Sequence, residues 1–261
     1  MRPKPIKALG QNFLIDQNIQ RKIIASCQLG LSDTIIEIGP GRGELTNLLV
    51  GAVKSLYAFE KDSRLAQTLE DSFKGRVDIK IINKDILKVD LNKYIESKKK
   101  IKVIGNIPYY ISTPIIEKLL EHRNIIDTIF ITVQKEFAER IVANPGPKIY
   151  GSLSCFVQYY SNPKILFTIS NSCFRPKPKV DSVFLELKVL PEPSVKVNDE
   201  DLFFKIIRAA FNQRRKTLRN SLEGVISKEK LEIFFAENNI NPNIRPEQLS
   251  LKYFSDLAGG S

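Results

Sequence analysis

The sequence predicts an α/β fold, in which helices cover a parallel sheet, followed by a small all-helical domain. Up to about residue 190, short β-branched runs alternate with amphipathic stretches, as in repeated βαβ units. The runs are apolar on both faces, as expected of strands that are buried on both sides. A segment rich in Pro, Ser and charge follows at 190–199, and beyond it only helical periodicity remains.

The expected strands lie at 34–39, 55–60, 77–83, 101–106, 127–133, 164–169 and 182–189. Amphipathic helices are expected between them at 43–51, 62–73, 113–122 and 134–143. The C-terminal helical stretches are "DEDLFFKIIRAAFNQRRKTLRNSL", "SKEKLEIFFAENNI" and "RPEQLSLKYFSDLA", and Asp199 and Ser227 are candidate N-caps. We therefore expect one domain over residues 1–190 and a second over residues 191–261.

The composition is that of a globular protein with a basic surface. The 261 residues include 40 Lys and Arg against 29 Asp and Glu, and the net charge of +11 favours a polyanionic partner, nucleic acid before an anionic membrane. Three Cys without a C-x-x-C pair and a single His argue against disulfides and a metal site. The N-terminus lacks the apolar core of a signal peptide, and no apolar run is long enough for a membrane span. We expect a cytoplasmic protein that does not associate with a membrane.

A glycine-rich loop, "IIEIGPGRGELT", joins the first expected strand to the helix after it, with Gly39, Gly41 and Gly43. Such glycines allow a tight turn and a close approach of a ligand to the main chain. The dinucleotide pattern G-x-G-x-x-G would need glycine at Glu44, and a Walker lysine is absent. The spacing therefore favours a different nucleoside ligand and argues against a dinucleotide oxidoreductase.

Carboxylates follow the next two strands. Glu60 can accept hydrogen bonds from both hydroxyls of a ribose, and Asp85 can accept one from an amino group such as that of adenine. Taken alone, each has a structural alternative, which for Asp85 is a helix N-cap. The carboxyl ends of parallel strands share one edge of the sheet, so these residues and the glycine loop predict one site. The pattern resembles class I methyltransferases, which implies a Rossmann-like sheet with S-adenosylmethionine as the cofactor.

The stretch "GNIPYYIS" follows the fourth strand, so "NIPY" (106–109) lies at the same edge. It resembles the (N/D/S)-(I/L/P)-P-(Y/F/W) motif of amino-methyltransferases that act on adenine or cytosine. The side-chain oxygen of Asn106 and a main-chain carbonyl beside Pro108 can hold both hydrogens of an exocyclic amine, and the nitrogen lone pair then points at the methyl group. Tyr109 offers a stacking face for the base.

Two basic segments are candidate RNA contacts. The loop "NSCFRPKPKVDSVF" (171–184) offers Phe174 as a second aromatic ring against the base, and Lys177 and Lys179 for phosphate. The stretch "QRRKTLR" (213–219) contributes Arg214, Arg215, Lys216 and Arg219. As part of one long helix, Arg215 and Arg219 would share a face and contact successive phosphates, although a solvated basic face is the alternative. The N-terminal residues Arg2, Lys4 and Lys7 are expected to form a flexible basic arm.

Taken in order, the motifs resemble the ribosomal RNA small-subunit adenine dimethyltransferase family (KsgA-like) over nearly the whole chain. They are "ALGQNFLID" (8–16), "EIGPGRGELT", "FEKD", "NKDIL", "GNIPYYIST", "VQKEFAERI", "FRPKPKVDSV" and "AFNQRRKTLRNSL". The resemblance implies cofactor contacts at Gln11, Asn12, Leu14, Gly39, Gly41, Glu60, Asp85 and Asn106, and a base pocket of Asn106, Pro108, Tyr109 and Phe174. One departure is Ile107, where many members have Leu, and it leaves the main-chain carbonyl in place.

The resemblance implies dimethylation of two adjacent adenosines near the 3′ end of small-subunit (16S) ribosomal RNA, within an assembling small subunit. We expect a monomer. Erm-type enzymes, which methylate large-subunit RNA, share the catalytic motifs, but "AFNQRRKTLRNSL" resembles the small-subunit enzymes. A non-enzymatic RNA-binding assembly factor should have lost Asn106, Tyr109 or the glycine loop, and all are present. An adenine DNA methyltransferase would need a target-recognition domain for which no length remains.

Overall fold

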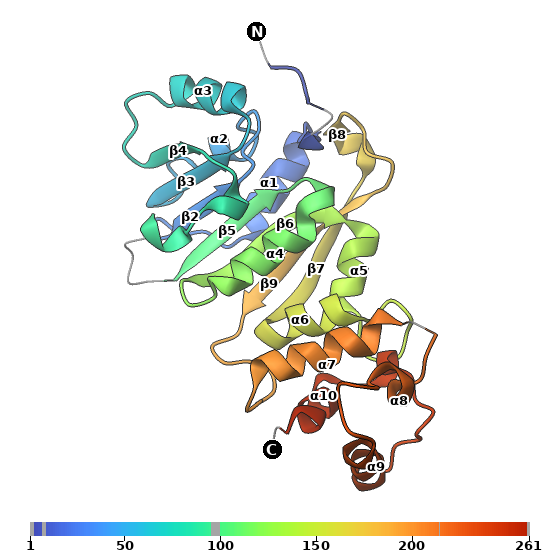
Figure 1. The fold of residues 1–261 in the computed structure, drawn as a ribbon. Coiled ribbons are helices and arrows are strands. Elements are labelled where there is room, and N and C mark those ends of the chain that lie inside the picture. The colour runs from blue at the N-terminus through green and yellow to red at the C-terminus, as the bar shows by residue number, and fades with distance from the viewer. Residues whose placement is uncertain (1–2, 7–8, 95–99, 214, 260–261) are drawn as a thin grey trace. The chain divides into compact units, whose positions relative to one another are not determined.

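The computed structural model describes residues 3–6, 9–94, 100–213 and 215–259. Its main sheet has seven strands in the spatial order β4-β3-β2-β5-β6-β9-β7 (Figure 1). In that order the strands are Ile79–Asn83, Ser55–Glu60, Thr34–Ile38, Ile101–Asn106, Ile126–Gln134, Ser182–Val189 and Ser161–Ile169. The first five strands in this order, from β4 through β3, β2 and β5 to β6, run parallel to one another. Strand β9 is antiparallel to β6. The expected α/β class is confirmed.

The order of the strands creates a crevice at the middle of the sheet. From β2 the chain continues to β3 and β4 on one side, and β5 and β6 lie on the other. The residue pairs Ile38–Phe59, Ile38–Gly105 and Glu60–Asn83 put the carboxyl ends of these strands level. Ligands of open α/β sheets bind where the strand order reverses in this way, so the crevice lies between the ends of β2 and β5.

Helices pack on the sheet through apolar residues at helical spacing. Helix α3 (Ser63–Ser72) contacts β3 and β4, and α4 (Ser112–Glu121) contacts β6. Helix α3 begins after Asp62, whose side chain accepts the N–H of Arg64. Of the expected helix at 43–51, only α2 (Thr46–Leu49) forms, because the residues before it are used for the glycine-rich turn.

A separate two-stranded sheet joins distant parts of the chain. Strand β1 (Phe13–Leu14) pairs antiparallel with β8 (Phe174–Arg175), so that Leu14 lies opposite Phe174. Helix α1 (Gln17–Ser26) follows β1 and is capped by Asp16, which accepts two main-chain N–H groups. The pairing places residues 13–14 beside the loop that precedes β9.

The chain divides into two compact units, residues 1–138 with 163–189, and residues 139–162 with 190–261. The expected first domain, 1–190, contains residues 139–162, which the structure groups with the second unit. The α-helices that lie wholly in this unit are α6 (Ser152–Tyr160), α7 (Glu200–Asn212), α8 (Leu218–Ser221), α9 (Lys228–Glu237) and α10 (Leu251–Ala258). Asp199 and Ser227 cap α7 and α9 as expected. Across the described ranges, no helix has the length and apolar character to cross a membrane.

The expected helix through "QRRKTLR" is interrupted. Helix α7 ends at Asn212, and α8 begins only at Leu218, with Thr217 as its N-cap. The sequence between them has long polar side chains and no apolar residue to bury, and helices in proteins depend on burying an apolar face. The prediction that Arg215 and Arg219 share a helix face is therefore wrong. Arg219 instead forms an ion pair with Glu232, with 2.6 Å between Nη2 and Oε1.

Candidate active site

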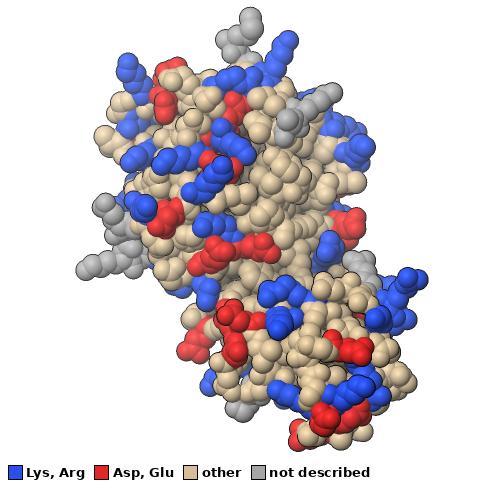
Figure 2. Space-filling view, in the orientation of Figure 1, with Lys and Arg blue, Asp and Glu red and all other residues tan. Residues whose placement is uncertain are grey.

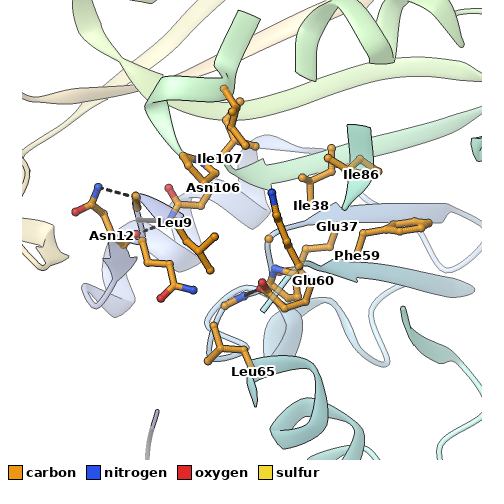
Figure 3. Close-up of a pocket in the computed structure, with 18 of the residues that line it drawn as sticks. Leu9, Asn12, Glu37, Ile38, Phe59, Glu60, Leu65, Ile86, Asn106 and Ile107 are labelled. Carbon is orange, nitrogen blue, oxygen red and sulfur yellow. Dashed lines mark hydrogen bonds between the residues drawn. The ribbon is translucent and has the colours of Figure 1, made fainter. Parts of the chain in front are cut away.

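A pocket opens at the carboxyl edge of the sheet, and its walls come from the ends of β2, β3, β4 and β5 and from residues 9–14 (Figure 3). The predicted site residues that line it are Gln11, Asn12, Leu14, Gly39, Gly41, Glu60, Asp85, Asn106, Pro108 and Tyr109. The structure thus brings together groups that lie far apart in the sequence. The pocket belongs to the first unit alone.

Glu60 is tied to the glycine loop. The residue is 6% exposed, and its two carboxylate oxygens accept the N–H groups of Gly41, at 3.1 Å, and Asp62, at 2.9 Å. Burial raises the pKa of Glu60, and these hydrogen bonds offset only part of that effect. Each carboxylate oxygen keeps a further lone pair, so Glu60 can still accept hydrogen bonds from ribose hydroxyls.

The glycine loop leaves space where other residues would carry a side chain. Gly39 and Gly41 have φ angles of +66° and +62°, which L-residues with a side chain rarely adopt. A Cβ atom on Gly41 would lie 3.1 Å from the ring of Phe13, and one on Gly39 would lie 3.7 Å from the main-chain oxygen of Asn106. The loop therefore forms a cradle of main chain between β1 and the end of β5.

Asp85 caps a short helix and also borders the pocket. One oxygen accepts the N–H of Leu87 at 3.1 Å, and the other lies 2.9 Å from Nζ of Lys61. Burial works against ionisation, but the Lys61 ammonium and the Leu87 N–H outweigh it and lower the pKa of Asp85. The helix-cap alternative weighed from the sequence is thus correct, and the carboxylate remains ionised beside the pocket.

Asn106 is oriented by a hydrogen bond from its own amide group. Its Nδ2 donates to the main-chain oxygen of Asn12 at 2.9 Å, and Figure 3 shows the two residues side by side at the pocket. Because the nitrogen is held in this way, Oδ1 is the atom left to accept a hydrogen bond. The carbonyl of Pro108 accepts the N–H of Ile111 at 3.2 Å, so that of Ile107 is the candidate second acceptor.

Tyr109 is half-buried and fixed through its hydroxyl group. Its Oη lies 2.6 Å from Oγ of Ser182, the fully buried first residue of β9. Burial raises the pKa of Tyr109, so the phenol stays neutral. Sequence reasoning missed Ser182, because nothing in "VDSVF" indicates that β9 places this hydroxyl beside the residue after Pro108.

Phe174 does not lie in the pocket, in contrast to the prediction that it completes an aromatic sandwich. Its side chain is fully buried in the hydrophobic core of the first unit, with Leu14, Ile104 and Phe184. The physical reason is the pairing of β8 with β1, which turns this residue toward the core. The flanking prolines and lysines made the segment resemble an exposed loop.

Two further acidic residues beside the site were missed. Glu37, inside β2, is 2% exposed and accepts a hydrogen bond from Thr46 Oγ1 at 2.8 Å. Burial raises the pKa of Glu37 to about 8. The guanidinium of Arg64 lowers the pKa of Asp62 to about 2, and Gln11 donates to the same carboxylate. A carboxylate within the apolar run "TIIEI" was the available signal for Glu37.

The expected flexible N-terminal arm is held down at residues 3–6. Nη2 of Arg42 donates to the carbonyl of Pro3 at 2.9 Å, and Nη2 of Arg64 donates to that of Lys4 at 3.3 Å. The guanidinium of Arg42 also lies 4.2 Å from the ring centre of Phe13. The prediction of a free arm is thus wrong for Lys4, whereas Arg2 and Lys7 lie outside the described residues.

The sequence matches the family described as "Ribosomal RNA adenine dimethylase" over residues 4–258. The chain belongs to this family. It is 45% identical over 253 residues to the "Ribosomal RNA small subunit methyltransferase A" of Clostridium botulinum (strain Loch Maree / Type A3), covering 97% of this chain and 92% of that protein. The protein of the same name from Clostridium perfringens (strain SM101 / Type A) is 46% identical, with 97% and 89% covered.

Two methyltransferases of known structure have the same fold as this chain. A dimethyladenosine transferase from Plasmodium falciparum superposes with a TM-score of 0.75 at 27% identity, covering 94% of this chain and 95% of that chain. The 23S rRNA methyltransferase ErmE gives a TM-score of 0.74 at 23% identity, with 95% and 99% covered, and at that identity the likeness concerns the fold alone. The expected class I methyltransferase fold is confirmed.

The lysines and arginines predicted to contact RNA are exposed wherever the structure describes them. Lys177 and Lys179 lie in the loop between β8 and β9. Arg215, Lys216 and Arg219 are exposed in the second unit, and Arg214 lies outside the described residues. Figure 2 shows Lys and Arg side chains over both units with acidic side chains among them, so the excess positive charge on this face is spread rather than gathered.

Proposed function

We propose that this chain dimethylates the exocyclic amines of two adjacent adenosines near the 3′ end of small-subunit ribosomal RNA, with S-adenosylmethionine as the methyl donor. The orientation of Asn106 carries the proposal, because its amide nitrogen is held by Asn12 and its oxygen remains an acceptor at the pocket. Membership of the adenine dimethylase family and 45% identity to a small-subunit methyltransferase support the same activity.

The residues of the pocket fit S-adenosylmethionine. The cradle at Gly39 and Gly41 would receive the part of the ligand that approaches the main chain, and Glu60 would accept the ribose hydroxyls. Apolar side chains such as Leu65 and Ile86 also line the pocket (Figure 3). Asp85, another lining residue, would accept a hydrogen bond from an adenine amino group. When bound, this cofactor supplies an electrophilic methyl group on a sulfonium centre.

The protein positions the adenine amine and needs no strong base. Oδ1 of Asn106 and the carbonyl of Ile107 accept the two amine hydrogens, so the nitrogen lone pair points away from both acceptors. Tyr109, fixed by Ser182, supports the base by stacking, which is worth roughly 1–3 kcal/mol. Holding the amine in one orientation lowers the entropic part of the barrier. The nitrogen becomes cationic as it reacts and then loses a proton readily to water.

The physiological substrate in this proposal is the small subunit during its assembly, and the protein acts as a cytoplasmic monomer. A net charge of +11 and the exposed Lys177 and Lys179 support binding to a polyanionic particle. The helical residues 191–261 are proposed to contribute RNA and ribosome contacts through Arg215, Lys216 and Arg219. The molar mass measured by light scattering in solution tests the monomeric state, since a dimer would have twice the mass of the chain.

The proposal is tested by transfer of labelled methyl groups to unmodified small subunits and, in parallel, to large-subunit RNA. We expect dimethyladenosine only in the small-subunit sample, and a loss of at least about 100-fold in Asn106→Ala. Asn92→Ala, at an exposed residue away from the pocket, is the matched control and should retain activity. Methylation of large-subunit RNA alone would assign the chain to the Erm type. Binding of small subunits without any transfer would make it an assembly factor.

A further inference from the structure

The second unit has a cavity of its own, with a volume of about 300 Å³. It lies between the residues that lead into α6, the C-terminal end of α7 and the short helix η6 (Pro246–Gln248). All of its lining residues belong to the second unit, so it is separate from the methyl-transfer pocket. A cavity of this size falls in the range of pockets that bind small ligands.

Positive charge dominates the lining. Arg140, Lys148, Arg215 and Arg245 border the cavity, and Glu247 is the one acidic lining residue. Arg140 is partly buried and the other three cations are exposed, and within the described ranges none of the four forms an ion pair. Four cations around one cavity outnumber the single carboxylate and repel one another, so an anion between them is favoured.

Hydrogen bonds hold the walls of the cavity in place. Oγ of Ser154 donates to the carbonyl of Arg140, and the side chain of Gln158 donates to the carbonyl of Ala143 at 2.9 Å. The N–H of Gly146 donates to the carbonyl of Glu247 at 2.7 Å, which joins the loop before α6 to η6. A preformed site loses less conformational entropy when a ligand binds.

An apolar surface lies beside the cations. Tyr150 is almost fully buried, and its ring meets that of Phe211 edge-on, with centroids 5.9 Å apart and 75° between the planes. Phe211 also contacts Phe254, yet it stays partly exposed and lines the cavity. Ile149 lines the cavity as well and is 46% exposed. Aromatic and apolar surfaces next to guanidinium groups are what protein sites for unpaired RNA bases use.

We propose that this cavity binds one unpaired nucleotide of an RNA strand, with the base against Phe211 and Ile149 and the phosphate between Arg140 and Arg245. The remaining cations, Lys148 and Arg215, exceed what a single phosphate needs and would contact the neighbouring phosphates, which favours a strand over a free nucleotide. Which RNA supplies the nucleotide rests on the proposed function, whereas binding of the nucleotide does not.

The test measures binding of labelled pentauridylate RNA by the full chain, because uracil does not compete for a pocket that takes adenine. Unlabelled uridine 5′-monophosphate and inorganic phosphate are the competitors. We expect the pentanucleotide to bind most tightly, the mononucleotide more weakly and phosphate weakest. Arg140→Met should weaken pentauridylate binding by about tenfold, as expected for loss of a charge-assisted hydrogen bond. Arg245→Met repeats the test at an exposed residue, where folding is not at risk.

Arg208→Met is the matched control, because Arg208 is exposed on α7 and does not line the cavity. An equal loss in this control would show diffuse charge attraction and overturn the inference. So would phosphate that competes as well as the mononucleotide, or binding that survives both Arg140→Met and Arg245→Met. Methyl transfer by the unaltered chain is measured separately. Failure there, with pentauridylate still bound through Arg140, contradicts the proposed function and leaves this inference standing.

Discussion

The hydroxyl groups of Tyr109 and Ser182 lie 2.6 Å apart and set the orientation of the ring proposed to support the substrate base. Ser182→Ala removes a hydrogen bond worth about 1 kcal/mol and lets the ring turn. We expect the KM for small subunits to rise several-fold, while the Kd for S-adenosylmethionine stays unchanged. Steady-state kinetics and a cofactor titration measure the two quantities.

Tyr109→Phe removes the same hydrogen bond from its other partner while keeping the aromatic ring. If the bond acts as inferred, the double variant with Ser182→Ala is no worse than either single variant. Losses that add in the double variant would show that the two hydroxyls act independently, and would contradict the interpretation.

The raised pKa of Glu37 predicts how the free energy of unfolding depends on pH. Its pKa is raised from 4.5 to about 8, so between these values the unfolded chain ionises the carboxyl group while the folded chain keeps it protonated. Here the folded state binds more protons, so the free energy of unfolding falls as pH rises, by at most about 1.4 kcal/mol per pH unit. Asp62, with its lowered pKa, has the opposite effect, and its contribution is lost only as pH falls from 3.8 toward 2.

Glu37→Gln should therefore weaken the loss of stability between pH 5 and pH 8 by a few kcal/mol, because glutamine does not ionise and can still accept the bond from Thr46. Denaturant unfolding at the two pH values measures this difference. Glu70→Gln, at an exposed glutamate, is the matched control and should follow the unaltered chain. A parallel pH dependence in Glu37→Gln and the unaltered chain would contradict a buried, protonated Glu37.

At the scale of elements, the strands and the glycine loop could be predicted because their signals are local. The apolar runs and the glycines of "GPGRG" depend on near neighbours, and Glu60 and Asn106 follow strand ends directly. Partners across the fold could not be predicted. Phe174 was expected at the pocket because the sequence around it gives no sign of its pairing with Leu14, which lies far away in the chain.

The break between α7 and α8 was missed because the local signal there is misleading. Gln, Arg and Lys are good helix formers, so "QRRK" reads as a continuing helix. Only the absence of an apolar face to bury, and the N-cap at Thr217, end the helix and start the next. Because Arg219 is engaged by Glu232, its expected share in phosphate binding is smaller than that of Arg215.

The glycine loop gives a prediction that separates a steric clash from backbone strain. In Gly41→Ala, the new methyl group would lie 3.1 Å from the ring of Phe13, at a residue with φ of +62°. We expect the Kd for S-adenosylmethionine to rise about tenfold or more, because the cradle must deform, as a cofactor titration can measure.

Gly75→Ala is the matched control for this variant. Gly75 has φ of +84°, but nothing lies within 4 Å of a Cβ placed there. It shares the backbone strain of Gly41→Ala without the clash, so stability should fall by about 1 kcal/mol while cofactor affinity is retained. Equal effects of both variants on the Kd would assign the loss at Gly41 to general destabilisation rather than to deformation of the cradle.

For the whole molecule, charge predicts how binding to the small subunit responds to salt. The logarithm of the affinity should fall linearly with the logarithm of salt concentration, since each phosphate contact releases counterions. Replacing Lys177 and Lys179 together by uncharged residues should reduce the magnitude of this negative slope by about 1 to 2, measured between about 50 and 200 mM salt. Replacing the exposed Lys54 and Lys80 instead should leave the slope unchanged.

The division into units was predictable only in part. The Pro- and Ser-rich segment near residue 190 is visible in the sequence, whereas the assignment of residues 139–162 to the second unit depends on packing. Tyr159 packs against Phe203 with ring centroids 5.0 Å apart, and no local pattern pairs these two aromatic residues. Long-range contacts between buried rings decide such boundaries.

On a translating ribosome, Phe13 and Leu14 emerge long before Phe174 and Arg175, the residues with which they pair, have been made. Until then β1 has no partner strand, and the adjacent carbonyl of Asn12 is not yet positioned to hold Asn106. The first residues of the active site are therefore among the last to become ordered. The active site is therefore complete only once the chain has been synthesised beyond Arg175.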